Sequence, residues 1–171
     1  MYNTYDENLS THTLECAFLT NFLCNIGNVY YNKNYDTNKL TTYSLYHDVT
    51  EIITGDMPTP IKYYNKEIKT TYKKIENEAT KKLLSLLPKE LYECYEPQLT
   101  IEVSQDEYKI IKIADTLCAY IKCKKEISLG NNEFKSAKKS IENKLNEFKS
   151  DELKHFMDFY ISTFDLTLDD I

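Results

Sequence analysis

The sequence contains one compact group of residues whose types suit metal-assisted chemistry: His47, Asp48 and Glu51. If the stretch after Asp36 is helical up to Thr54, His47 and Glu51 lie one turn apart on one face, with Asp48 about 100° round the axis. Imidazole and carboxylate groups bind borderline divalent cations, and a nearby Glu that is not a ligand can move protons on bound water. With 3 His in 171 residues, about 0.2 His-Asp pairs arise by chance. A solvent-exposed polar patch is therefore the alternative interpretation of this group.

Two further residues, distant in the sequence, strengthen the metal hypothesis. Asp115 interrupts the apolar stretch Ile-Ile-Lys-Ile-Ala-Asp-Thr-Leu, where a carboxylate is costly unless it is paired or bound to a metal. His12 lies at the start of another apolar stretch. Helical bundles build metal sites from side chains on facing helices, so three helices could bring His12, Asp115 and the His47-Asp48 pair to one interior point. The alternatives are a solvated His12 and an exposed Asp115 beside Lys112.

The elements that must position these residues are expected to be helices. Only 3 Gly and 4 Pro occur in 171 residues, and apolar residues recur with a helical period over most of the chain. We therefore predict an all-α helical bundle that forms a single domain over residues 1–171. The helices are expected at residues 11–26, 37–54, 62–87, 105–129, 133–149 and 151–163, with a shorter segment at 90–95 before Pro97.

Local signals support several of these helices. Every fourth residue of the first helix is large and apolar, and its expected buried face consists of Leu14, Phe18 and Phe22, with Ala17 beside them. Ser104 and Glu107 have the spacing of a capping box, which predicts that a helix starts there. Gly55 is expected to end the second helix, because the Met-Pro-Thr-Pro stretch that soon follows cannot continue one.

Composition excludes several classes of protein. The 21 basic and 27 acidic residues give a net charge of −6, which argues against sequence-independent binding to long DNA or RNA. The sequence opens without a secretory signal and contains no 18-residue apolar run, so we expect no membrane association. The five cysteines form no CxxC pattern and are expected to be buried thiols in a reducing cytoplasm. All 21 basic residues are Lys, so no guanidinium group is present for a phosphate site.

The candidate residues follow the order H…HD…D, which resembles the HD-domain superfamily of metal-dependent phosphohydrolases. A closer likeness is carried by the strings HDVTEIITGDMPTPIKY at 47–63, ENLSTHT at 7–13 and ADTLCAYIKC at 114–123. GNNEF at 130–134 and FDLTLDD at 164–170 extend this likeness over nearly the whole chain. In these strings the chain resembles the bacterial HD-domain 5′-deoxynucleotidases.

That resemblance implies an all-α homodimer that hydrolyses deoxynucleoside 5′-monophosphates to deoxynucleosides and phosphate. It implies one divalent transition metal ion, with Co²⁺ favoured over Mn²⁺, Zn²⁺ or Fe²⁺. Glu51 would be the catalytic carboxylate, and Asp56 would lie near the sugar hydroxyls. The implied metal ligands are His12, His47, Asp48 and Asp115. The implied nucleotide pocket is lined by Asp56, Met57, Pro58 and Thr59.

The family also has an Arg-Trp pair upstream of the stretch that matches residues 1–8. This sequence, which is expected to be N-terminally short relative to the family, contains neither residue type. Lys62 is then the nearest cationic candidate for the substrate, with a surface lysine as the alternative. Two other functions stay open: an HD phosphohydrolase that acts on another nucleotide or phosphoester, and a metal- or nucleotide-binding protein with weakened or no turnover. The absence of Arg counts against triphosphate substrates, and Glu51 counts against a protein that only binds.

Overall fold

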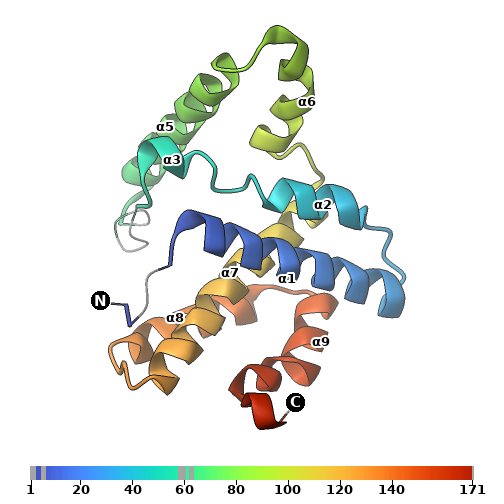
Figure 1. Cartoon of the computed structure of the whole chain (residues 1–171), viewed down its shortest axis with the longest axis vertical. Coiled ribbons are helices and arrows are strands. Elements are labelled where there is room, and N and C mark those ends of the chain that lie inside the picture. Colours follow the sequence, from blue (N-terminus) through green and yellow to red (C-terminus); the bar gives the residue numbers. More distant parts are fainter. Residues whose placement is uncertain (1–2, 5–6, 58–60, 62–63, 171) are drawn as a thin grey trace. The chain divides into compact units, whose positions relative to one another are not determined.

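The computed structural model describes residues 3–4, 7–57, 61 and 64–170, and this part of the chain contains helices and turns but no strand (Figure 1). The all-α prediction is therefore confirmed. The chain divides into two compact units: unit 1 consists of residues 1–44 and 103–171, and unit 2 of residues 45–102. The expectation of a single domain stays a prediction. Among the described residues, no helix combines the length and the apolar character needed to cross a membrane.

Unit 1 is built around two long helices, α1 (Leu9–Tyr30) and α7 (Gln105–Ser128), which pack against each other (Figure 1). α1 also packs against α2 (Thr37–Ser44) and α9 (Asp151–Phe159), and α7 packs against α8 (Phe134–Glu147). Two short 3₁₀ helices, η1 (Ile161–Asp165) and η2 (Leu168–Asp170), follow α9. α7 supplies much of the core, which explains its apolar sequence: Ile110, Ile111, Ile113, Ala114 and Leu117 are all at most 1% exposed.

The predicted buried face of α1 is wrong for its three large residues and confirmed for Ala17, which is 3% exposed. Leu14, Phe18 and Phe22 are 50%, 66% and 38% exposed. The buried side of the helix carries mostly smaller residues: Cys16, Ala17, Thr20, Leu23, Cys24, Ile26 and Gly27. A Cβ atom on Gly27 would lie 2.7 Å from Cε2 of Tyr35, so the helix packs closely there because this residue has no side chain. Hydrophobicity alone favoured the face with the larger side chains, whereas close packing selected the face with the smaller ones.

Polar contacts cap the start of α7 and join α7 to the N-terminal residues of unit 1. The Ser104 hydroxyl accepts a hydrogen bond from the Glu107 backbone N–H, and the Glu107 carboxylate accepts one from the Ser104 backbone N–H. These two bonds confirm the predicted capping box. Further along α7, the fully buried carboxylate of Glu126 accepts hydrogen bonds from the backbone N–H and the hydroxyl of Thr4, at 2.9 and 2.6 Å. The side-chain amide of Asn131 donates to the same carboxylate at 2.8 Å. These contacts close a loop of 122 residues between Thr4 and Glu126.

The predicted helix 37–54 is wrong in its second half. α2 ends at Ser44, residues 45–50 form turns, and only Glu51–Thr54 is helical again, as α3. Within the turns the backbone hydrogen bonds join residues three positions apart, as from the Glu51 N–H to the Asp48 carbonyl at 2.9 Å. The Thr41 hydroxyl donates to the Thr37 carbonyl and the Ser44 hydroxyl to the Thr41 carbonyl, at 2.7 and 2.8 Å. Such local bonds compete with a continuous helix and favour its termination.

Unit 2 contains α3, α5 (Lys66–Ser85) and α6 (Lys89–Thr100), and α5 packs against the other two. α5 lies within the predicted 62–87. Near its end Leu84 is buried, while Leu86, just beyond the helix, is 72% exposed. α6 continues through Pro97, where the sequence predicted a short segment that stops before it. Ile101 ends α6 in the left-handed conformation, with φ 52°, and its N–H donates to the Pro97 carbonyl.

Candidate metal centre

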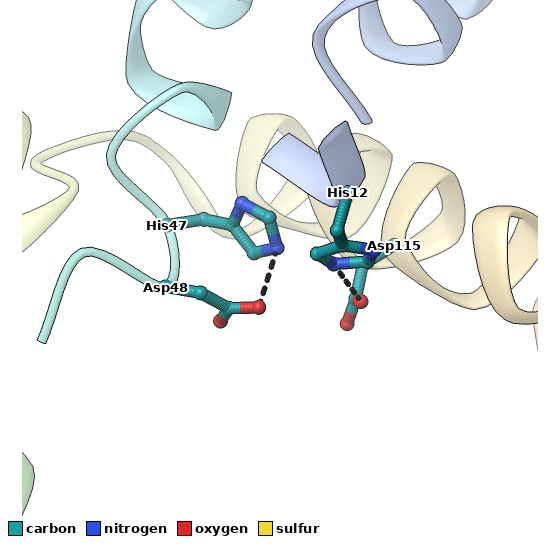
Figure 2. Close-up of side chains that lie close together, drawn as sticks. All are labelled: His12, His47, Asp48 and Asp115. Carbon is teal, nitrogen blue, oxygen red and sulfur yellow. Dashed lines mark ion pairs between the residues drawn. The ribbon is translucent and has the colours of Figure 1, made fainter. Parts of the chain in front are cut away.

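Unit 1 contributes one histidine–aspartate pair. His12 lies in the first turn of α1, and Asp115 lies in the middle of α7. The packing of these two helices places Nε2 of His12 3.5 Å from Oδ1 of Asp115 (Figure 2). Both side chains keep some contact with solvent, at 21% and 26% exposure. The structure therefore brings these two of the four candidate residues next to each other.

The second carboxylate oxygen of Asp115 faces a different partner. Nζ of Lys112, one turn earlier on α7, lies 3.5 Å from Oδ2 of Asp115. The same Nζ lies 5.8 Å from the centre of the Tyr108 ring, within range of a cation–π contact. The two oxygens of Asp115 thus have separate neighbours: an imidazole at Oδ1 and an ammonium group at Oδ2. The sequence hypothesis considered Lys112 only as a sign that Asp115 is exposed, and did not assign it to the site.

Unit 2 contributes the other histidine–aspartate pair. Nε2 of His47 lies 3.0 Å from Oδ2 of Asp48 (Figure 2). The His47 side chain is 1% exposed and that of Asp48 is 23% exposed. Both residues belong to the turns between α2 and α3, so their ligand atoms converge through turn geometry and not through the helical periodicity that the sequence suggested.

Glu51 stays close to this pair along the chain. It is the first residue of α3, and its backbone N–H donates to the Asp48 carbonyl at 2.9 Å. The prediction that His47 and Glu51 share one helical face is wrong, because no helix covers both residues. The turn nevertheless holds the Glu51 backbone in a fixed relation to Asp48.

The expected pocket turn is described only in part. α3 ends at Gly55, which has φ 67°, as the sequence predicted, and the following Asp56 is exposed while Met57 is half-buried. The hydroxyl of the buried Tyr72 on α5 donates to the Gly55 carbonyl at 3.3 Å and so anchors the turn. This contact was missed in the sequence, where Tyr72 is one of many scattered tyrosines. The other residues assigned to the substrate lie outside the described part of the chain: Pro58, Thr59 and Lys62.

The donor atoms in the two pairs are of the types that bind divalent transition metal ions. Each of the four residues offers one ligand atom, an imidazole nitrogen or a carboxylate oxygen: His12, His47, Asp48 and Asp115. Imidazole nitrogen suits Zn, Cu, Fe and Ni, and carboxylate oxygen extends the range to Mn. The donor set is therefore compatible with a divalent metal site, and it does not identify the ion.

Comparison with known proteins identifies the family. The family model described as 5′-deoxynucleotidase YfbR-like matches residues 1–164. A protein of Photobacterium profundum named 5′-deoxynucleotidase is 44% identical over 172 aligned residues, which cover all of this chain and 89% of that protein. The chain belongs to the YfbR-like 5′-deoxynucleotidase family. Other 5′-deoxynucleotidases, from Vibrio vulnificus and Photorhabdus temperata, are 42% and 44% identical, with 89% and 87% of their lengths covered.

Solved structures support the same fold for this member of the YfbR-like family. An HD-domain phosphohydrolase from Listeria innocua superposes with a TM-score of 0.85 at 21% identity, covering 95% of this chain and 79% of that one. A conserved hypothetical protein from Pyrococcus furiosus gives a TM-score of 0.65 at 20% identity, covering 95% of this chain and 85% of that one. The predicted HD-domain fold is therefore confirmed.

Proposed function

We propose that this protein is a metal-dependent 5′-deoxynucleotidase, which hydrolyses (deoxy)nucleoside 5′-monophosphates to the nucleoside and phosphate. The observation that carries the proposal is the 44% identity, over the whole chain, to proteins named 5′-deoxynucleotidase. The HD-domain fold and the two histidine–aspartate pairs agree with this chemistry.

His12, His47, Asp48 and Asp115 are the proposed ligands of one divalent ion, with Co²⁺ the leading candidate and Mn²⁺, Zn²⁺ or Fe²⁺ the others. The resemblance to the family motif supports this assignment, and so does the chemistry of the donor set. When bound, such an ion supplies positive charge for the phosphate and acidity for a coordinated water. Neutral imidazoles and ionised carboxylates must be available for binding, so the affinity for the ion is expected to fall in acid.

Glu51 is the proposed catalytic carboxylate. It is the first residue of α3 and follows Asp48 by three residues, so it comes directly after the turns that carry two proposed ligands. A carboxylate there can orient the attacking water, or pass a proton to the departing 5′-oxygen of the nucleotide. A protein that only bound nucleotides would not need such a group.

The turn after α3 is the proposed nucleotide pocket, with Asp56 placed near the sugar hydroxyls. Met57, Pro58 and Thr59 complete the proposed lining, and Lys62 is its proposed cationic neighbour. A turn that contains Pro loses little conformational entropy when it orders around a ligand, which favours binding. The hydrogen bond from Tyr72 to Gly55 supports the start of this turn from α5.

We further propose that the protein is a cytoplasmic homodimer. The large apolar side chains exposed along α1 are candidates for the subunit contact: Leu14, Phe18 and Phe22. Four of the five cysteines are buried thiols, which is typical of a reducing compartment. Size-exclusion chromatography with light scattering tests the dimer, and a monomer at micromolar concentration would contradict it.

A substrate panel tests the activity. Protein reconstituted with Co²⁺ is incubated with deoxy- and ribonucleoside monophosphates, triphosphates and cyclic dinucleotides, and phosphate release is measured with and without chelator. Chelator-sensitive release from deoxynucleoside monophosphates supports the proposal. Release only from other substrates would place the chain among HD phosphohydrolases of a different specificity, and nucleotide binding without release would identify a binding protein.

A substitution tests the ligand assignment separately from turnover. Asp115→Ala is expected to abolish retention of Co²⁺, measured by calorimetric titration, while the helical circular dichroism stays largely intact. Asp106→Ala, at an exposed position in the first turn of the same helix, is the matched control and is expected to keep the ion. Stoichiometric Co²⁺ in the Asp115→Ala protein would remove this residue from the ligand set.

A further inference from the structure

A phosphate monoester carries up to two negative charges, and the chain has only lysines with which to meet them. All 21 basic residues are Lys. In unit 1 several of them are engaged away from the His12–Asp115 pair. Lys122 pairs with Glu7, Lys124 pairs with Asp165 at 2.7 Å, and Lys109 donates to a backbone carbonyl. Lys112, by contrast, pairs with Asp115, one of the proposed metal ligands.

The position of Lys112 suits a second role beside this pairing. Its Nζ lies 3.5 Å from Oδ2 of Asp115, longer than the usual N–H···O hydrogen bond of about 2.7 to 3.2 Å. An ammonium group has three donors, so it can contact more than one acceptor at a time. The side chain is 37% exposed, which lets a ligand reach it from solvent.

The surroundings of Lys112 also limit its freedom. The residue lies on α7 between Ile111 and Ile113, which are both fully buried, and its Nζ lies over the Tyr108 ring at 5.8 Å. A cation held over an aromatic ring has fewer rotamers to lose when a ligand binds. Lys112 is therefore a partly preorganised positive charge at the edge of the proposed centre.

We propose that Lys112 binds the phosphate group of the substrate, beside the cation held by His12 and Asp115. This inference rests on the proposed function. Oδ1 of Asp115 faces His12 and Oδ2 faces Lys112, so the carboxylate has the proposed metal ligand on one side and the ammonium on the other. A phosphate, which presents several oxygens at similar spacing, can accept hydrogen bonds from Nζ with one oxygen while another lies toward the cation. A lysine meets a terminal phosphate as a point charge, without the paired geometry of a guanidinium.

One substitution at Lys112 is expected to change the affinity for phosphate and the affinity for Co²⁺ differently. Lys112→Met removes the charge and keeps the aliphatic bulk. It is expected to weaken binding of inorganic phosphate, used as a competitive inhibitor of the Co²⁺ protein, by about tenfold to hundredfold, since a hydrogen bond to a charged group contributes on this scale. KM for a deoxynucleoside monophosphate is expected to rise with it. Affinity for Co²⁺ is expected to stay the same or increase, because a positive charge has been removed from beside a ligand.

Two further variants complete the experiment. Lys124→Met, on the same helix but paired with Asp165, is the matched control and is expected to leave phosphate affinity unchanged. Lys112→Arg keeps the charge and is expected to restore part of the phosphate affinity. Unchanged phosphate affinity in Co²⁺-loaded Lys112→Met would overturn the role of Lys112 alone. Failure of the wild-type protein to bind Co²⁺ would overturn the proposed function and this role together.

Discussion

Replacing Glu126 with Ala should destabilise the protein strongly, although this residue lies outside the proposed centre. Its carboxylate is fully buried and accepts hydrogen bonds from Thr4 N–H, the Thr4 hydroxyl and the Asn131 amide, at 2.9, 2.6 and 2.8 Å. A buried donor left without an acceptor costs about 1 to 3 kcal/mol. Thr4 is exposed enough for water to replace part of what it loses, so we expect the free energy of unfolding to fall by roughly 3 kcal/mol.

Urea denaturation followed by circular dichroism measures this change from the midpoint and slope of the transition. Glu78→Ala is the control, since the Glu78 carboxylate also has a close partner, Lys81 Nζ at 2.7 Å, but both side chains are 71% exposed. We expect little change there, because water and salt screen exposed ion pairs. A double-mutant cycle with Thr4→Ala isolates the contact that closes the long loop. If Glu126→Ala moved the midpoint no more than Glu78→Ala does, the buried network would not hold the N-terminal residues as the structure indicates.

Four other changes have distinct expected outcomes. Glu51→Gln should keep Co²⁺ binding but lower turnover at least about 10²-fold, and a near-normal rate would remove Glu51 from the mechanism. Burial raises the pKa of Glu152, but hydrogen bonds from Ser150 and Tyr35 outweigh it and leave this pKa below its usual value. Its stabilising effect is therefore present above the usual pKa and lost as the pH falls toward the lowered one, so Glu152→Gln should flatten the acid limb of the stability–pH curve. Ile101→Gly should raise the free energy of unfolding by up to about 1 kcal/mol, because φ 52° strains a β-branched residue. The urea midpoint should then rise, and a lower midpoint would contradict this. Gly27→Ala should cost about 1 to 3 kcal/mol in the same assay, since its Cβ would meet the Tyr35 ring at 2.7 Å.

Elements with strong local signals were predicted well. The capping box at Ser104 marks the start of α7, and this signal acts within a few residues of the helix end. Where tertiary packing or weak local preferences decided the outcome, the sequence misled. The large apolar residues of α1 suggested one buried face, while packing around Gly27 selected the opposite side. Likewise Pro97 suggested a stop, but it lies late in α6, where the helix continues for only one further turn.

The site was predictable in its composition and less so in its geometry. Asp115 was identified as costly in an apolar helix, and it does contact His12 from a helix far away in the sequence. His47 and Asp48 also contact each other, but from turns, because side-chain hydrogen bonds from Thr41 and Ser44 favour the end of α2. Lys112 could not be assigned from spacing alone, since an i, i+3 pair with Asp115 on a helix has the same spacing whether or not a ligand binds there.

The five cysteines give the chain a built-in chemical reporter. Cys94 is exposed in unit 2, while the other four are buried in unit 1: Cys16, Cys24, Cys118 and Cys123. Burial raises the pKa of Cys24 to about 12, so its thiolate is scarce near neutral pH and its alkylation must wait for local opening. A maleimide dye should therefore mark the native chain once, at Cys94. The slower labelling of the buried cysteines would then measure the rate of local opening in unit 1, without any engineered label.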